Sequence, residues 1–203
     1  FSMPRTDLAV TARGVRIRPA LSLGSWLAFR PAGEGREAVA MGDLVLTEEE
    51  YNRVISRLQQ GGVGQTAVHK HLPAHAPALW WTHVHARGDP VRIAVAVRAA
   101  LALTGTPPQG PASAATAPLA LDTAGIRRAL GRAGRVNGGV YQVSVPRPET
   151  IRSMGIEVPP SMGVATALNF QPTGRGGAAA NGGYVMSADQ VDGVVRAPRE
   201  QGV

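Results

Sequence analysis

The chain has 203 residues, of which 44% are hydrophobic, so it can bury a core in one large domain or two small ones. It contains no cysteine, which excludes disulfides, thiolate metal sites and a cysteine nucleophile. No apolar run reaches the length of about eighteen residues that predicts a membrane-spanning helix. The net charge of +7 comes from arginines scattered along the chain with few aromatic residues between them, so we do not expect nucleic-acid binding.

The first predicted elements are two strands at 14–29 and 38–46. Both segments are apolar, rich in β-branched residues and bounded by glycine or proline. A helix should follow from Thr47, because Glu50 three residues later completes a capping box. Its apolar residues recur at helical spacing, which predicts a buried stripe made of Tyr51, Val54, Ile55 and Leu58.

Two more strands are expected at 64–72 and 78–87, paired as a hairpin across residues 73–77. A helix over 91–103 should come next, since Asp89 is a good N-cap and Pro90 suits the first helical position.

All five histidines of the chain lie in this hairpin. Side chains two residues apart on a strand point to the same face, so each H-x-H pair presents two imidazoles side by side. If the two pairs converge, they form a site for a divalent transition metal, with His69, His71 and His83 as ligands and His85 or a nearby carboxylate as the fourth. Zinc is the expected metal, with copper and iron as alternatives. The competing interpretation is a surface hairpin whose imidazoles bond to backbone and water.

The sequence contains an internal repeat, because residues 1–63 and 143–203 follow one pattern. FSMPR at 1–5 matches VSVPR at 143–147, and residues 38–63 align with 178–203 without a gap. The second copy begins with an expected helix at 123–131 and repeats the capping box as Ser187 and Gln190. Pro198 should shorten or break its last helix.

We therefore predict an α+β fold of two tandem antiparallel-sheet units, each with the order helix, three strands, helix, two strands, helix, and an incomplete second copy. The first unit should cover 1–104 and the second 120–203. A Pro/Ala-rich linker at 105–119 is expected to be mobile and to have no catalytic role. A partner subunit could supply the strands that a truncated copy lacks, so a homodimer is a further expectation.

The segments GGVYQVSVPR, MGDLVLTEEE, TAVHKHL and THVHARGDP together resemble the LppY/LpqO-like family of bacterial lipoproteins and secreted proteins. The resemblance implies a duplicated unit of unassigned function and an extracytoplasmic location. By position it places the family's recurrent histidines at His69, His71 and His83, and its aspartates at Asp43 and Asp89. The chain begins at Phe1 and not at methionine, so we expect that any export signal has been removed.

The functional hypothesis is a zinc-type site that supports a hydrolase or lyase, because three histidines and an open position lower the pKa of a bound water to about 7. Asp43 and Glu50 are the candidate bases, although Asp43 also suits a turn and Glu48, Glu49 and Glu50 suit the first turn of a helix. Trp81 and Arg87 are candidate contacts for an unidentified small-molecule ligand. The alternative is a non-catalytic envelope module that sequesters a small molecule or a metal.

Overall fold

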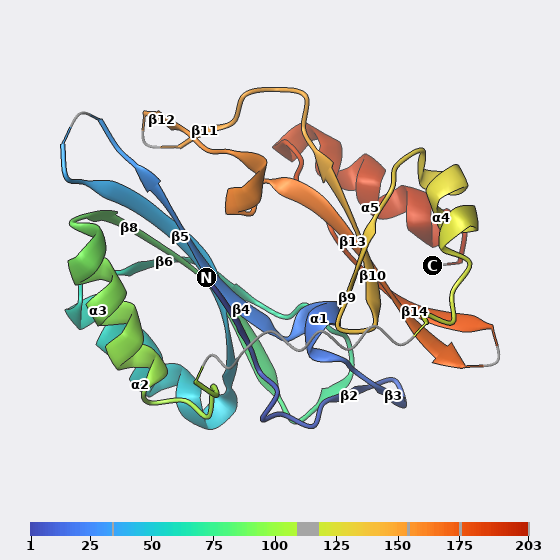
Figure 1. Cartoon of the computed structure of the whole chain (residues 1–203), viewed down its shortest axis with the longest axis horizontal. Coiled ribbons are helices and arrows are strands. Elements are labelled where there is room, and N and C mark those ends of the chain that lie inside the picture. Colours follow the sequence, from blue (N-terminus) through green and yellow to red (C-terminus); the bar gives the residue numbers. More distant parts are fainter. Residues whose placement is uncertain (34, 109–117, 154, 175, 203) are drawn as a thin grey trace.

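The computed structural model describes residues 1–33, 35–108, 118–153, 155–174 and 176–202. It contains two sheet-based units that follow each other along the chain (Figure 1). The elements of the first unit are β1 (Ser2–Pro4), β2 (Thr11–Ala12), β3 (Val15–Arg16), α1 (Pro19–Ser22), β4 (Gly24–Pro31), β5 (Ala38–Thr47), α2 (Glu48–Gln60), β6 (Gly64–His69), β7 (His75–Ala76), β8 (Leu79–Gly88) and α3 (Pro90–Leu101). Those of the second are α4 (Thr123–Leu130), β9 (Arg135–Asn137), β10 (Val140–Pro146), β11 (Arg152–Ser153), β12 (Ile156–Glu157), η1 (Pro160–Met162), β13 (Ala165–Gly174), β14 (Gly177–Gly183), η2 (Ala188–Gln190) and α5 (Val191–Glu200).

The main sheet of the first unit has the strand order β1-β4-β5-β8-β6, and every neighbouring pair is antiparallel. Its two faces differ because side chains alternate along each strand. One face carries Leu44, Leu46 and Val84 against α2 and α3, and these side chains form the first hydrophobic core. The opposite face carries Val45 and Trp81 in a second core, with Asp43 and His83 farther along the same strands. The sheet therefore has one helix-covered face and one face that is free to build a site.

The predicted helices of the first unit are confirmed. Thr47 caps α2 and forms the capping box with Glu50, and Asp89 caps α3 by accepting hydrogen bonds from two backbone N–H groups. The expectation of one strand over 14–29 is wrong, because α1 and a loop interrupt it between β3 and β4. Pro19 accounts for the interruption, since it cannot donate to a strand ladder and it is suited to the first turn of a helix.

The second unit has a four-stranded sheet in the order β14-β13-β10-β9, and the helix expected at 123–131 is present as α4. Its strands correspond to those of the first unit: β10 to β1, β13 to β4 and β14 to β5. The prediction that Pro198 shortens or breaks the last helix is wrong. α5 continues to Glu200, and together with η2 it spans the residues that align with α2. Pro198 lies in the last turn, where its missing N–H removes only one hydrogen bond from the ladder.

An arginine, buried in the first unit and half-buried in the second, holds the strand-helix junction of each unit in the same way. In the first unit, Arg5 donates to the carbonyl oxygen of Val45 and to both oxygens of Glu50, and it also pairs with Asp7. In the second unit Arg147 donates to the carbonyl oxygen of Val185, to Gln190 and to Glu149, the equivalent positions. Each arginine ties the first strand of its unit to the capping box of the helix.

Glu50 makes this junction dependent on pH. Burial alone would raise the pKa of Glu50, but hydrogen bonds from Arg5, from the N–H of Thr47 and from the N–H of Gly105 outweigh it, so that the pKa is lowered. An acid with a lowered pKa stabilises the fold above its ordinary pKa, and this contribution is lost as the pH falls through the folded value.

The two sheets turn their uncovered sides toward each other, with α2 and α3 outside the first sheet (Figure 1). Hydrogen bonds of amide side chains join the units: Gln171 bridges the backbone of Arg16 and Arg18, Gln142 donates to the carbonyl oxygen of Ala20, and Asn181 donates to the carbonyl oxygen of His71. The antiparallel sheets and the duplicated arrangement confirm the predicted fold class. None of the helices in the described chain is long and apolar enough to cross a membrane.

The predicted unit boundaries at 104 and 120 stay predictions. Most of the expected linker, residues 109–117, lies outside the described residues, so the structure does not test its predicted mobility.

We expect Glu50→Ala to lower the free energy of unfolding by about 3 kcal/mol or more, because it leaves the fully buried Arg5 without its main partner. The matched change Gln190→Ala removes a neutral partner from the less buried Arg147 and should cost about 1 kcal/mol. Urea denaturation of both variants measures the difference. Equal losses would show that the buried charge pair has no special role.

Candidate metal centre

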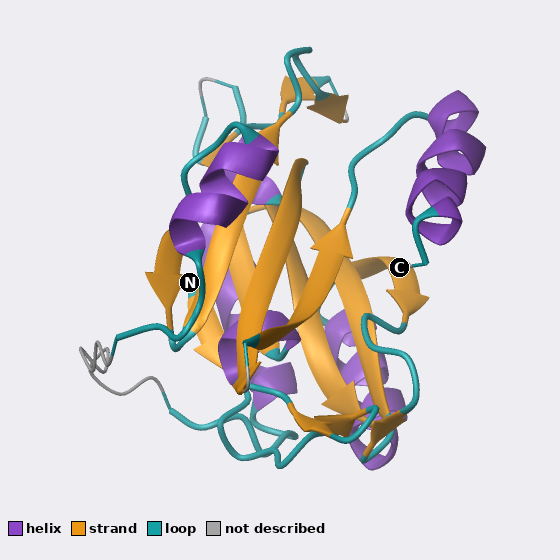
Figure 2. Ribbon diagram, turned by 90° about the vertical axis from the view of Figure 1, so that its right-hand side faces the viewer, coloured by secondary structure: helices purple, strands orange, loops and turns teal. Residues whose placement is uncertain are grey.

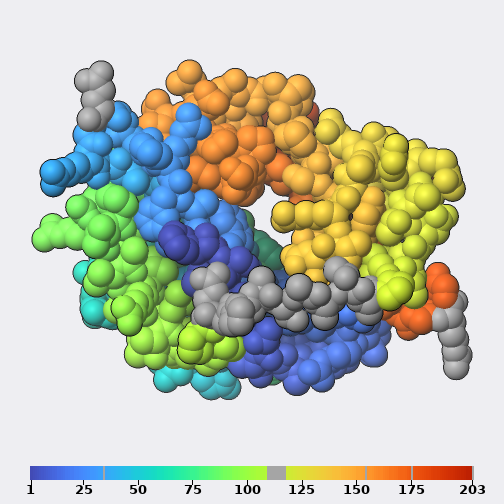
Figure 3. Space-filling model, in the orientation of Figure 1, coloured from blue at the N-terminus to red at the C-terminus, as the bar shows by residue number. Residues whose placement is uncertain are grey.

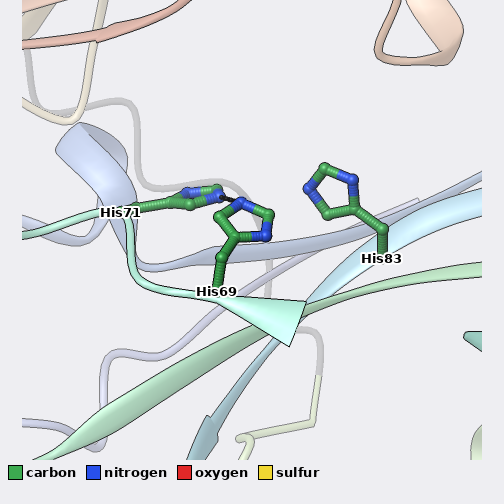
Figure 4. Close-up of side chains that lie close together, drawn as sticks. All are labelled: His69, His71 and His83. Carbon is green, nitrogen blue, oxygen red and sulfur yellow. Dashed lines mark hydrogen bonds between the residues drawn. The ribbon is translucent and has the colours of Figure 1, made fainter. Parts of the chain in front are cut away.

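Three imidazoles converge on the uncovered face of the first sheet. One ring nitrogen from each of His69, His71 and His83 lies within 4.8 Å of the others, and the Nε2 atoms of His69 and His71 are 2.8 Å apart. Figure 4 shows the three rings projecting from neighbouring backbone segments toward a common region. Ligand atoms of a tetrahedral zinc site lie about 3.3 Å apart, given zinc-nitrogen distances of about 2.0–2.1 Å. The separation of 2.8 Å for one pair and the limit of 4.8 Å for the group lie on either side of this spacing.

The pairing of β6 with β8 brings the histidines together. Ala67 of β6 lies opposite His83, so that His69 falls diagonally across from His83 on the same face. His71 lies beyond the end of β6, where the chain bends, and not on a strand as the sequence predicted. The ring of His71 stacks on the fully buried ring of Trp81 with centroids 4.9 Å apart. Trp81 is itself fixed because its Nε1 donates to the carbonyl oxygen of Ser22.

A buried carboxylate completes the cluster. Asp43 pairs with His83 across β5 and β8, and its Oδ2 lies 3.6 Å from the Nε2 atoms of both His71 and His83. Its other oxygen, Oδ1, is buried and has no hydrogen-bond partner among the described residues. Next to Asp43, a Cβ atom on Gly42 would clash with the carbonyl oxygen of Trp26, so glycine is needed for this close approach of β5 to β4. The interpretation of Asp43 as a turn residue is wrong, because it lies within β5.

Burial sets the protonation states of the cluster. It raises the pKa of Asp43 to about 7, and burial together with the charges of His69 and His83 lowers the pKa of His71 to about 3. Burial, with His69 as a second cause, also lowers the pKa of His83. Neutral imidazoles keep the lone pairs that bind metal ions, so His71 and His83 are ready ligands at neutral pH.

The cluster opens into a cleft of about 1010 Å³ between the two units. The space-filling view shows the molecule hollowed between the blue and green first unit and the orange and yellow second unit (Figure 3). The second unit supplies a wall of small and amide side chains, including Gln142, Asn169 and Asn181. Gly183 occupies the position that corresponds to Asp43, so this wall leaves room opposite the cluster.

The other residues proposed from the sequence lie elsewhere. His85 is on the same strand as His83, but it is outside the group of three, and its buried Nε2 has no partner among the described residues. Glu50 is held by Arg5 and the helix cap, and it does not line the cleft. Arg87 pairs with Glu37 and does not line the cleft either. Trp81 lies beneath His71, where it supports the ring, and its own ring is fully buried.

Sequence reasoning missed the contribution of the second unit. The side chain of Asn181 donates to the carbonyl oxygen of His71 at 2.9 Å and so fixes the bend that carries this histidine. Asn181 aligns with Met41 of the first copy, so the departure from the repeat was visible in the sequence. Its partner could not be inferred, because the contact depends on how the two units face each other.

The fold and the cluster define a class: a duplicated α+β protein whose first unit carries three converging histidines above a cleft. A family described as Domain of Unknown Function (DUF1259) matches residues 1–103 and 124–203. The match covers most of both units, so the chain belongs to this family. The searches among curated proteins and among solved structures found no match. The match in two regions supports the duplication. The family has no described function, so the chemistry is argued from the residues of the site.

We expect Asp43→Asn to stabilise the metal-free chain, and to do so more at pH 8 than at pH 5. A carboxyl group whose pKa is raised by folding destabilises the protein more and more as the pH rises from the ordinary pKa of the group to its pKa in the folded state. The gain should grow by about 2 to 4 kcal/mol between these two conditions. Thermal or urea unfolding in the presence of a chelator measures it. The unchanged chain and the variant share His71 and His83, so these histidines do not contribute to the difference. An equal gain in stability at both pH values would contradict the burial of an ionisable Asp43.

Proposed function

We propose that this chain binds one divalent transition metal ion, most favourably zinc, through His69, His71 and His83. The observation that carries the proposal is the convergence of three ring nitrogens on one region from β6, the bend after it and β8. The donor set supports it, because neutral imidazole is a preferred ligand of zinc and also suits copper and iron. The unpartnered oxygen of Asp43 supports it further, since a cation beside the histidines would compensate the buried carboxylate.

The activity that fits this site is that of a metal-dependent hydrolase or lyase. Three protein ligands leave a position open toward the cleft, and the metal would supply a Lewis acid and an activated water there. Asp43 is the candidate base, because it is near two of the histidines and its pKa is raised to about 7. Apart from Asp43, the charged residues that line the described cleft are Lys70 and Arg135, so an anionic substrate is favoured.

A non-catalytic function is the alternative, and the position of Asp43 is the observation that favours it. Its Oδ2 is 3.6 Å from two histidine nitrogens, close to the spacing of ligands around one ion. If Asp43 is the fourth ligand, the site is closed and the protein sequesters a metal or holds a small molecule without turning it over.

We also propose that the protein functions outside the cytoplasm. The support is the resemblance of the TAVHKHL and THVHARGDP segments to LppY/LpqO-like lipoproteins and secreted proteins.

Isothermal titration of the metal-stripped chain with zinc tests the proposal. We expect one zinc per chain, and a loss of affinity of more than about 100-fold in His69→Ala, His71→Ala and His83→Ala, since losing a ligand costs more than losing an outer hydrogen bond. His75→Ala and His85→Ala are the matched controls, because these histidines lie outside the cluster, and both should keep the site. Full zinc binding by the double variant His69→Ala, His71→Ala would contradict the proposal.

Hydrolysis of a phosphate monoester such as 4-nitrophenyl phosphate by the same zinc-loaded samples separates the two functions. Turnover that disappears with the chelator and falls in Asp43→Asn supports the hydrolase. Tight zinc binding without turnover, weakened in Asp43→Asn, supports sequestration with Asp43 as the fourth ligand.

Asn181→Ala should lower zinc affinity by about 10-fold, in the range found when groups that orient metal ligands are removed. The variant removes the hydrogen bond to the carbonyl oxygen of His71, so the bend that carries this ligand is no longer held in place. Asn169→Ala is the matched control, because Asn169 is a second amide on the same wall of the cleft. If both variants bind zinc as the unchanged chain does, the second unit does not position the site.

A further inference from the structure

A row of polar side chains crosses the second sheet on the face that lines the cleft. It takes one residue from each strand, and we call it the polar row: Arg135 of β9, Gln142 of β10, Asn169 of β13 and Asn181 of β14. Each member lies directly opposite the next in the strand register, so the side chains point to the same face, and all of them line the cleft. Figure 2 views the molecule from the side of the second unit and shows the strands of its sheet lying side by side.

The amides of the polar row distinguish the second copy from the first. Asn169 and Asn181 align with Ala28 and Met41, which also lie opposite each other in the first sheet. Two apolar side chains of one copy are therefore two amides in the other. Because these amides face a cleft and not a core, they are placed to form hydrogen bonds with an occupant.

Two members of the polar row are free to bind a ligand. Gln142 and Asn181 each donate to a backbone carbonyl oxygen of the first unit. The side chains of Arg135 and Asn169 form no hydrogen bond or ion pair with any described residue. A free amide both donates and accepts hydrogen bonds, so Asn169 suits a hydroxyl group.

Arg135 supplies the free positive charge of the cleft. Lys70 also lines the cleft, but its Nζ lies 5.1 Å from the centroid of the Trp80 ring, where a cation-π contact holds it. Arg135 is exposed and has no acidic partner in the described part of the chain. A guanidinium offers parallel N–H donors that match the two oxygens of a carboxylate, so Arg135 suits an acidic group of the ligand.

The polar row sets the length and direction of a ligand. Its Asn181 end contacts the backbone of His71 and so lies next to the three histidines. Neighbouring strands are about 4.8 Å apart, so Arg135, at the other end of the four strands, is about 14 Å away. A ligand that binds Arg135 and also reaches the metal centre is therefore elongated. Beside the polar row, small residues leave room for its body: Ser144, Ala167 and Gly183.

The first unit adds an aromatic surface to the cleft. Trp26 lies directly opposite Asp43 in the register of β4 and β5, and it lines the cleft. Its ring is half-buried, and its indole N–H has no partner among the residues that the structure describes. A Cβ atom on Gly163 would lie 2.8 Å from this ring, so glycine allows the backbone of the second unit to hold its edge. A flat apolar ring beside free amide donors suits a sugar, which has C–H faces and hydroxyl edges.

We propose that the cleft binds an acidic oligosaccharide two or three sugar residues long. A carboxylate of this ligand binds Arg135, its hydroxyl groups bind Asn169, and its other end lies at the three histidines. The inference deepens the metal-site proposal, on which it rests for the reactive end alone, by naming the substrate class. It also gives the second unit a function, because this unit recognises the ligand that the first unit binds through the metal.

Calorimetric titration of the whole chain with digalacturonate, an acidic disaccharide, tests the inference. Galabiose is the matched neutral disaccharide, with the same linkage and ring configuration, and triglutamate is an acidic peptide for comparison. We expect digalacturonate to bind at least about 10-fold more tightly than either, because it alone combines carboxylates with hydroxyl groups.

Variants of the cleft separate the two contacts. Arg135→Ala should raise the dissociation constant of digalacturonate at least about 10-fold and leave that of galabiose unchanged, since it removes only the charged contact. Asn169→Ala should raise both constants about 5-fold, because the hydroxyl contact is common to both sugars, and it should keep the zinc affinity. Arg132→Ala is the matched control, because Arg132 is an exposed arginine that does not line the cleft, and this variant should bind both sugars as the unchanged chain does.

The inference is overturned if digalacturonate binds no more tightly than galabiose, or if Arg135→Ala and Arg132→Ala bind it equally. Tighter binding of triglutamate would overturn it as well, since the cleft would then select an acidic peptide. Titrations of the metal-free and the zinc-loaded chain keep it separate from the metal-site proposal. Binding of digalacturonate that depends on Arg135 in a chain without zinc affinity would support the inference and contradict only the metal site. Zinc binding without digalacturonate binding would overturn only the inference.

Discussion

The antiparallel pairing of β5 with β8 fixes both sides of the first unit. Its register sets Asp43 opposite His83 and Val45 opposite Trp81 on one face, while Leu44 and Val84 turn toward the helices on the other. A shift by one residue would move every one of these side chains to the opposite face. The hydrophobic core therefore specifies the register, and the register in turn places a carboxylate beside the imidazoles. The candidate site depends on the packing of α2 and α3 without touching either helix.

The duplication has produced two units with one scaffold and different surfaces. Arg5 and Arg147 hold equivalent junctions, and both helices begin with a capping box. The faces that meet at the cleft have diverged. Where the first copy has Asp43, the second has Gly183, and small and amide side chains take the place of a charged cluster. One unit thus supplies the reactive groups of the site, and the other supplies a wall of mostly small and amide side chains, with Arg135 among them, and a hydrogen bond that positions His71.

Much of this could be predicted from local sequence. Thr47 with Glu50 and Asp89 with Pro90 are short-range signals whose physics is complete within one helical turn, and the structure confirms both helix starts. The structure brings together three of the four histidines proposed from their spacing, although His71 lies on the bend after β6 and not on the strand. The interruption at Pro19 and the continuation through Pro198 were misjudged, since the effect of a proline depends on its place within the element.

The remaining features depend on register and on contacts between the units, which local patterns do not contain. Asp43 was interpreted as a turn residue because it follows a glycine, whereas Gly42 is required by the close approach of β4. His85 has the same spacing as His83, yet it lies outside the cluster, because it is opposite Gly64 at the start of β6, whereas His69 and His71 lie at and beyond the end of that strand. Trp81 was expected to contact a small-molecule ligand, whereas in the structure its ring stacks against the ring of His71 and supports it.

X-ray absorption spectroscopy at the zinc edge, on the chain loaded with one equivalent of zinc, tests the central claim most directly. The account requires a four-coordinate shell in which three imidazole nitrogens lie at about 2.0–2.1 Å, with an oxygen ligand as the fourth. A shell of oxygen ligands alone, or one with a single imidazole, would contradict it, because the three rings would then not share an ion.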